Sequence, residues 1–349
     1  MKVLIYTDPH WSQYSSILRS RNEYHSVRLS NLIDSINWTE ELAVRAGCTV
    51  VMCLGDFFDS NHLNAEEISA LQHIRWSNCS HVFLTGNHET NMSNLEYSTA
   101  DLFNLCPDAR VVATPQQYFI DGTDCEFCFL PYVLERDRKT LQEYFGQSSA
   151  KRIIFSHNDL KDVQYGSFLS TEGFELNDIH ENCDLYFNGH IHHCCNVTDK
   201  VINIGNLTGQ NFTEDATKYS HCAVVIDTET LEYKFYENPY AFKFYKLDAT
   251  QCKTEAEVKQ FLTQIKSNGV VTLHVNSNLA DTARMFLEEL KKDWIHEYRV
   301  NVKHELTKTS IESTSLQTVD HLQQFEQYAI NNIENSDIVK EELQAIMRG

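Results

Sequence analysis

Short runs of apolar residues recur along the first two-thirds of the chain and predict buried strands. Five such runs are each followed by polar residues, and they lie at residues 2–6, 49–54, 81–84, 152–155 and 185–188. Between residues 26 and 46 the apolar residues recur at helical spacing instead, and Gly47 is expected to end that helix. Asn64 and Glu67 predict a capping box at the start of the next helix. Buried strands that alternate with helices predict an α/β fold.

Shorter segments of alternating polarity predict a second sheet. They are several runs between residues 111 and 133, and residues 232–236, where aromatic and charged side chains alternate. Cys125 and Cys128 form a Cys-x-x-Cys pair in one of these runs. Because the sequence has no second such pair to complete a zinc site, we expect the two thiols to pack in the core.

The composition changes near residue 247, which we predict to end a first domain of residues 1–246. Residues 247–304 predict the order helix, strand, helix, strand, as in a small separate α/β domain. Residues 305–349 predict a polar linker and a tail of two short amphipathic helices. Helices this short are marginal in water, so their apolar faces need either the chain's own small domain or a partner's groove.

The charge and the cysteines limit where the protein works and what it binds. There are 29 basic and 49 acidic side chains, a formal net charge of −20, so the chain is not expected to coat nucleic acid by charge alone. The eleven cysteines lack the spacing of a secreted scaffold, and no signal peptide pattern precedes the first strand. We therefore expect reduced thiols and a cytoplasmic location. No membrane association is expected, because no apolar run approaches spanning length.

All five buried strands end in residues that can bind a metal ion. The side chains after the strands are, in order, Asp8 and His10, Asp56, Asn87 and His88, His157, and His190 and His192. Ligands of open α/β sheets bind at the carboxyl ends of the strands, so we expect these side chains to meet. Asp59 and His62 lie near these positions, and we expect structural or supporting roles for them; His193 is expected to be a neighbour of the site and not a ligand.

The composition of this set predicts the kind of metal. Imidazole, carboxylate and amide ligands without a thiolate suit manganese, iron or zinc. Even without His88 this set offers seven ligands, which exceeds the needs of one tetrahedral site, so we expect two divalent ions, with manganese supporting activity best. Two ions bridged by a carboxylate are the standard arrangement for phosphoryl hydrolysis.

These motifs, in this order, resemble the calcineurin-like metallophosphoesterase superfamily. The resemblance covers about residues 1–240 and implies a four-layer α/β/β/α fold, in which a two-sheet β-sandwich is flanked by helices. It implies one metal ion held by Asp8, His10, Asp56 and His192. It implies a second ion held by Asp56, Asn87, His157 and His190, so that Asp56 bridges. His88 would then protonate the leaving oxygen rather than bind metal.

Within that superfamily the chain resembles the SbcD-type nuclease subunits of DNA double-strand-break repair, including phage-encoded relatives. The similarity lies in Gly55-Asp56-x-Phe58-Asp59, in Asn177-Asp178-Ile179, in Asn203-Ile204-Gly205-Asn206-Leu207, and in residues 247–304, which resemble that family's capping domain. One departure is Glu89, which stands where the nucleases usually have aspartate; its longer side chain can still reach far enough to orient His88. The resemblance implies an exonuclease and endonuclease acting on DNA, gripped through its C-terminal helices by an SbcC-type coiled-coil ATPase. It also allows a homodimer.

A second function stays open. An autonomous phosphodiesterase or phosphatase acting on a small molecule would use the same residues, and the net charge of −20 favours it. The predicted small domain and amphipathic tail favour the nuclease. A non-catalytic scaffold is disfavoured because every ligand position is filled.

Overall fold

Two six-stranded sheets form the centre of the chain in the computed structural model, which describes residues 1–15, 18–119, 125–165, 168–291 and 294–303. The first sheet has the order β16 (Tyr233–Glu237), β15 (Cys222–Asp227), β1 (Lys2–Tyr6), β2 (Val50–Cys53), β3 (Ser80–Leu84), β6 (Ala109–Val112). The second has the order β13 (Cys195–Asn196), β14 (Val201–Asn203), β12 (Leu185–Asn188), β9 (Lys151–Ser156), β8 (Cys125–Leu130), β7 (Gln116–Phe119). The five strands that precede the candidate ligands are parallel within each sheet, since β1, β2 and β3 are neighbours in one, and β9 and β12 in the other.

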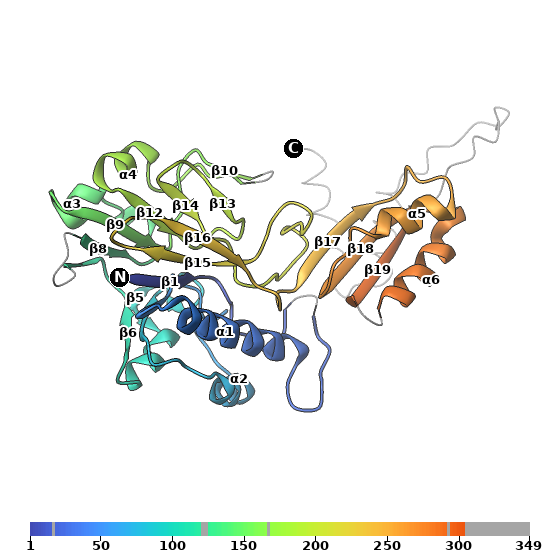
Figure 1. Ribbon diagram of the computed structural model, residues 1–349, viewed down its shortest axis with the longest axis horizontal. Coiled ribbons are helices and arrows are strands. Elements are labelled where there is room, and N and C mark those ends of the chain that lie inside the picture. The colour runs from blue at the N-terminus through green and yellow to red at the C-terminus, as the bar shows by residue number, and fades with distance from the viewer. Residues whose placement is uncertain (16–17, 120–124, 166–167, 292–293, 304–349) are drawn as a thin grey trace, which may run out of the picture. The chain divides into compact units, whose positions relative to one another are not determined.

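The inner faces of the two sheets pack against each other. Val3 and Ile5 of the first sheet share a buried cluster with Phe155 and Phe187 of the second. The outer face of the first sheet packs on α1 (Val27–Ala46), and that of the second on α3 (Leu141–Phe145) and α4 (Leu176–Asn182). Figure 1 shows this arrangement of helix, sheet, sheet and helix. The predicted sandwich flanked by helices is thereby confirmed.

The first two helices predicted from the sequence are present. The Ser26 side chain caps α1 by accepting a hydrogen bond from the backbone of Leu29, and Gly47 ends it in the left-handed region at φ 71°. Asn64 and Glu67 form the predicted capping box of α2 (Ala65–Ala70). Further 3₁₀ turns span Leu71–His73, Thr99–Leu105, Glu135–Asp137 and Ser277–Leu279.

Two strands expected in the second sheet belong to the first. Strand β6 pairs in parallel with β3, and β16 pairs antiparallel with β15. Both lie at the edges of the first sheet, where one face is open to solvent. Alternating polarity marks such a half-exposed strand in either sheet, so the pattern could not tell the two sheets apart. Cys125 and Cys128 pack in the cores on opposite faces of β8, as expected.

A small parallel sheet follows the sandwich. Its order is β17 (Lys243–Asp248), β18 (Gly269–Asn276) and β19 (Ile295–Lys303). Helices α5 (Glu255–Leu262) and α6 (Ala280–Leu290) pack on it around Val258, Ala283 and Leu287. The helix and strand order predicted for residues 247–304 is present, and the predicted boundary after residue 246 falls inside β17. The predicted tail of residues 305–349 lies outside the described residues.

Two short hairpins complete the described elements: β4 (Thr90–Asn91) with β5 (Asn94–Ser98), and β10 (Gln164–Tyr165) with β11 (Phe168–Leu169). Within the described ranges, no helix has the length and apolar character that crossing a membrane requires.

Candidate metal centre

The loops after β1 and β2 are tied together by backbone hydrogen bonds beyond the ends of the strands. The N–H of Asp8 donates to the carbonyl of Gly55 over 3.1 Å, and that of His10 to the carbonyl of Asp56 over 3.0 Å. Asp8, His10, Asp56 and His190 all have positive φ, between 47° and 68°. Such backbone conformations are costly for residues other than glycine and cluster at functional sites. These loops are therefore built to hold their side chains in place.

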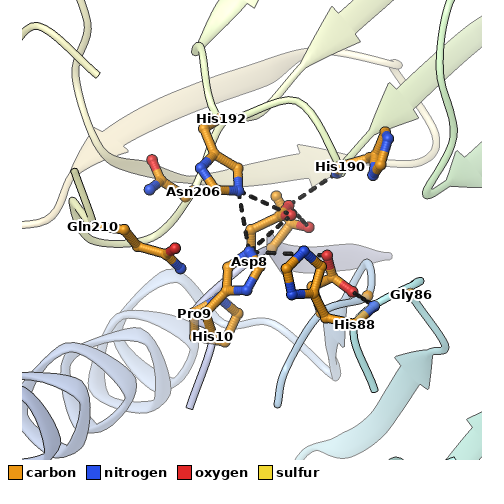
Figure 2. Close-up of polar contacts among 12 residues, drawn as sticks. Asp8, Pro9, His10, Gly86, His88, His190, His192, Asn206 and Gln210 are labelled. Atoms are coloured by element: carbon orange, nitrogen blue, oxygen red, sulfur yellow. Dashed lines mark hydrogen bonds and ion pairs between the residues drawn. The ribbon is translucent and has the colours of Figure 1, made fainter. Parts of the chain in front are cut away.

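The structure brings the ends of the five strands together in three overlapping groups. Their possible ligand atoms lie within 4.8 Å of one another in each group, and the groups are Asp8, His10 and His192; His10, Asp56 and His88; and Asp56, His157 and His190. Figure 2 shows His10 and His192 pointing toward Asp8, with Nε2 of the two imidazoles 3.0 Å apart. Asp56 belongs to two of the groups. Its Oδ2 lies 3.2 Å from His157 Nε2 and 3.8 Å from His10 Nε2.

Several buried polar atoms in this site lack a hydrogen-bond partner. Within the described chain they include Asp8 Oδ1, Asn87 Oδ1 and His157 Nε2. A buried polar atom without a partner is costly unless something else binds it. The other carboxylate oxygen of Asp8 already accepts from the Thr7 hydroxyl and the His190 N–H. A carboxylate oxygen, an amide oxygen and an imidazole nitrogen are atoms that suit divalent metal ions as ligands.

One ring nitrogen of each histidine is held by a neighbouring oxygen, which leaves the other nitrogen for a metal. Nδ1 of His10 is 2.9 Å from Asp59 Oδ1, and Nδ1 of His192 is 2.7 Å from Glu214 Oε1. Nδ1 of His157 donates to the carbonyl of Leu54 over 2.6 Å. Nε2 of His190 is 3.3 Å from Asp159 Oδ2. Such partners fix the tautomer and direction of metal-binding imidazoles.

The charges in the cluster shift the pKa values of its members. Burial opposes ionisation of Asp8, but His157, His10 and His192 lower its pKa to about 2. Burial likewise opposes a charge on His10, but Asp59 and Asp8 raise its pKa to about 10. Asp56 has a pKa well below its usual range because the nearby His157 outweighs burial. Since only neutral imidazole binds a metal, loading this site with ions is coupled to the release of protons.

The Glu89 carboxylate binds backbone groups of two loops and does not orient His88. This buried carboxylate accepts the backbone N–H groups of Gly86 and Phe58, both over 2.9 Å, and so ties together the loops after β2 and β3. Burial, followed by the charge of Asp56, raises the pKa of Glu89 to about 7. The carboxylate near His88 belongs to Asp59 instead. His88 Nδ1 lies 3.3 Å from the backbone oxygen of Asp59 and 3.7 Å from its Oδ1.

The loop before His88 requires glycine. A Cβ on Gly86 would overlap the Oδ1 atom of Asp56, the same atom that accepts the His88 N–H over 2.9 Å. The close approach of these two loops places Asn87 and His88 beside Asp56. The His88 ring packs edge-on against that of His10, with 4.7 Å between centroids, and its side chain is 45% exposed. An exposed imidazole at the edge of the cluster is positioned to meet a substrate.

The sequence alone did not reveal three residues around this site. Glu214 is buried and binds His192 from 22 residues away in the chain, so no local motif marked it. Asp159 lies two residues after His157, and that proximity was an available signal. Arg28 is buried in α1, and its guanidinium donates to the carbonyls of Pro9 and Gly209, both over 2.9 Å. Together these residues brace the loops from outside the cluster.

Comparison with known families agrees with this geometry. The family model described as calcineurin-like phosphoesterase matches residues 1–194, which is more than half of the chain. The chain belongs to the calcineurin-like phosphoesterase family. A search of curated proteins finds no match to this phosphoesterase.

The solved structures that match this chain are distant in sequence. They include an archaeal phosphodiesterase at 16% identity and a TM-score of 0.35, which covers 68% of this chain and 99% of its own. The protein TT1561 of Thermus thermophilus has 10% identity and a TM-score of 0.40, covering 68% and 98%. A dimetal phosphatase from Danio rerio has 13% identity and a TM-score of 0.38, covering 68% and 99%.

The site can therefore carry out metal-dependent hydrolysis of a phosphate ester. The chemistry that a pair of divalent ions supplies in such a site is activation of water and stabilisation of charge on the phosphoryl oxygens. The chain itself would provide the ligand atoms, and the partners of His10, His157, His190 and His192 hold these candidate side chains in one orientation.

We expect Glu214→Gln to weaken metal binding while keeping the fold. The amide keeps the size of the side chain but loses the charge that directs Nε2 of His192 toward Asp8. Loss of such a supporting carboxylate typically costs 10–100-fold in metal affinity, and we expect a loss of roughly that size by calorimetric titration with manganese.

Glu232→Gln, at an exposed position before β16, serves as the matched control and should bind manganese like the parent protein. An unchanged affinity in Glu214→Gln, with an unchanged melting temperature, would show that Glu214 does not support the site.

Proposed function

We propose that this phosphoesterase is a manganese-dependent DNA nuclease subunit of the SbcD type. The observation that carries the proposal is the small parallel unit β17–β18–β19 with α5 and α6, which follows the sandwich directly. The sequence resemblance implies a capping domain for these residues, and a parallel α/β unit in that part of the chain supports the proposal. A phosphatase acting on a small molecule has no evident need for it, whereas a long polymer needs surface beyond the metal site.

In this proposal Asp56 would be a ligand of both ions. Asp8, His10 and His192 would complete the first site, and Asn87, His157 and His190 would complete the second. His88 does not hold a metal; its imidazole donates a proton to the oxygen that leaves the phosphorus. The position of His88 at the exposed edge of the cluster, beside Asp59, supports this role because a proton donor must reach the substrate.

The nuclease is proposed to act with an SbcC-type coiled-coil ATPase. The partner would supply the DNA-binding charge that a chain of net charge −20 lacks. A homodimer within the assembly and a cytoplasmic location remain predictions from the sequence.

An assay on linear double-stranded DNA with manganese, run beside one on cyclic nucleotides, tests the function. The proposal predicts cleavage of DNA that a chelator abolishes and manganese restores better than magnesium. Hydrolysis of the cyclic nucleotides without any cleavage of DNA would instead favour the autonomous small-molecule phosphodiesterase.

The tail gives a test of the partner. We expect deletion of residues 306–349 to leave a folded, metal-loaded phosphoesterase that no longer co-purifies with the ATPase, because the predicted amphipathic helices would be gone. Undiminished affinity for the ATPase would contradict the tail's role. Aggregation or loss of metal would show that the tail belongs to the core of the chain.

A further inference from the structure

A large hollow lies next to the metal centre, and Tyr132, one of its lining residues, packs near His190. The volume of the hollow is about 740 Å³, within the range of ligand sites in proteins. One wall is the hairpin of β4 and β5, which begins directly after Glu89. The other wall is the segment of residues 132–139 together with Tyr144. The hollow is therefore bounded by a direct continuation of the motif that carries Asn87 and His88.

The second wall is fixed to the metal-binding loops. Tyr132 donates its backbone N–H to the carbonyl of Thr85 over 2.9 Å, just before Gly86. Val133 donates its N–H to the side-chain oxygen of Asn158 over 3.0 Å, just after His157. The ring of Tyr132 lies 5.8 Å from that of His190. Tyr132 thus belongs both to the hollow and to the surroundings of the candidate metal ligands.

Three cationic side chains line the hollow, although the chain as a whole is strongly acidic. Arg136, Arg138 and Lys139 line it, against the acids Glu96 and Asp137. The Arg138 guanidinium is mostly buried over the ring of Phe174 and pairs with Glu135, while its Nε has no hydrogen-bond partner in the described chain. Arg136 is 74% exposed, and its Nε lies 3.5 Å from Asp137. Lys139 is exposed, and its ammonium has no ion pair within the described ranges.

Aromatic rings accompany these cations. Tyr132 and Tyr144 line the same hollow, and Tyr144 is held in place by donating its hydroxyl to the carbonyl of Asp137 over 3.2 Å. Grooves that bind single-stranded nucleic acid combine cations that follow the backbone with aromatic rings on which bases stack. Both features are present here within one hollow next to the site of hydrolysis.

We propose that this hollow binds the single-stranded DNA segment next to the phosphate that is cleaved. Arg136 and Lys139 contact the phosphates of that segment, and Tyr132 stacks on the base closest to the metal centre. The proposal rests on the proposed function, since it names the part of the substrate that extends away from the same site. It explains how an acidic chain holds a polyanion locally.

The test measures binding of a short fluorescein-labelled single-stranded DNA by fluorescence anisotropy, with a chelator present so that no cleavage occurs. We expect the double variant R136A/K139A to bind roughly tenfold more weakly than the parent at low salt. Each phosphate contact on a single strand contributes about 0.7 to the slope of log affinity against log salt, so losing two should reduce the slope by about 1.4. A merely structural role for these side chains would leave the salt slope unchanged.

The control is the double variant K2A/R45A, which also removes two positive charges. Lys2 begins β1 and Arg45 lies at the end of α1, so both are at the end of the first sheet that is opposite to the candidate ligands. This variant should bind DNA with the parent's salt slope. Equal slopes for the parent and R136A/K139A would overturn the proposal, as would equal losses in both double variants. Binding is measured without hydrolysis, so the two proposals can fail separately. If the nuclease assay fails but R136A/K139A still reduces the salt slope of DNA binding, the proposed function is rejected and the proposal that the hollow binds DNA stands.

Discussion

Replacing Asp56 with asparagine is expected to remove both metal ions together and to abolish hydrolysis. Asp56 Oδ2 lies close to both His157 and His10, and no other carboxylate of the described chain belongs to two of the three groups. An amide cannot supply the negative charge that two cations share. Loss of a residue that only supports a metal ligand typically lowers metal affinity or activity by about 10–100-fold. For the loss of a ligand itself we expect activity to fall by more than about 100-fold. Elemental analysis of the purified variant measures the metal content.

The control for this variant is Asp34→Asn, on the exposed side of α1, which should keep both ions and full activity. An Asp56→Asn protein that still carries two ions would rule out Asp56 as the bridge. A protein that loses one ion and keeps the other would show two independent sites.

The second large effect is expected at His88. A general acid typically contributes about 10²–10⁴-fold in rate, and its contribution is largest when the leaving oxygen is a poor leaving group. His88→Ala should therefore slow hydrolysis of an unactivated phosphodiester by about that factor. An aryl diester, whose leaving group needs no proton, should be affected much less. Turnover of both substrates measures the difference.

The metal content of His88→Ala shows whether His88 is a proton donor or a metal ligand. His88 lies in one group with His10 and Asp56, so a metal could reach it. Unchanged metal content in His88→Ala supports the proton donor, whereas loss of an ion would make His88 a ligand. Equal slowing of both substrates would mean that His88 only positions the substrate. His73→Ala, at an exposed histidine in the 3₁₀ turn Leu71–His73, is the control and should change neither rate nor metal content.

The sequence predicted which residues meet, because the strands that precede them are parallel within each sheet. Asp8, Asp56 and His88 follow neighbouring strands of the first sheet, and His157 and His190 follow neighbouring strands of the second. The carboxyl ends of parallel neighbouring strands lie at the same edge of a sheet. Apolar runs followed by polar residues are therefore enough to predict which polar side chains meet there.

What the sequence could not predict depends on contacts between distant segments. Glu214 reaches His192 from a loop without a periodic pattern, and Glu89 turns toward backbone groups of two loops rather than toward His88. The edge strands β6 and β16 were assigned to the wrong sheet because alternating polarity reports solvent exposure and not the neighbouring strand. Each of these outcomes was set by tertiary packing.

Anomalous X-ray scattering from crystals soaked in manganese locates bound ions without reference to activity, and so tests the two-metal centre itself. We expect two peaks, one beside Asp8, His10 and His192 and the other beside Asn87, His157 and His190. Asp56 should contact both. A single peak, or two peaks that do not share Asp56, would contradict the two-metal centre.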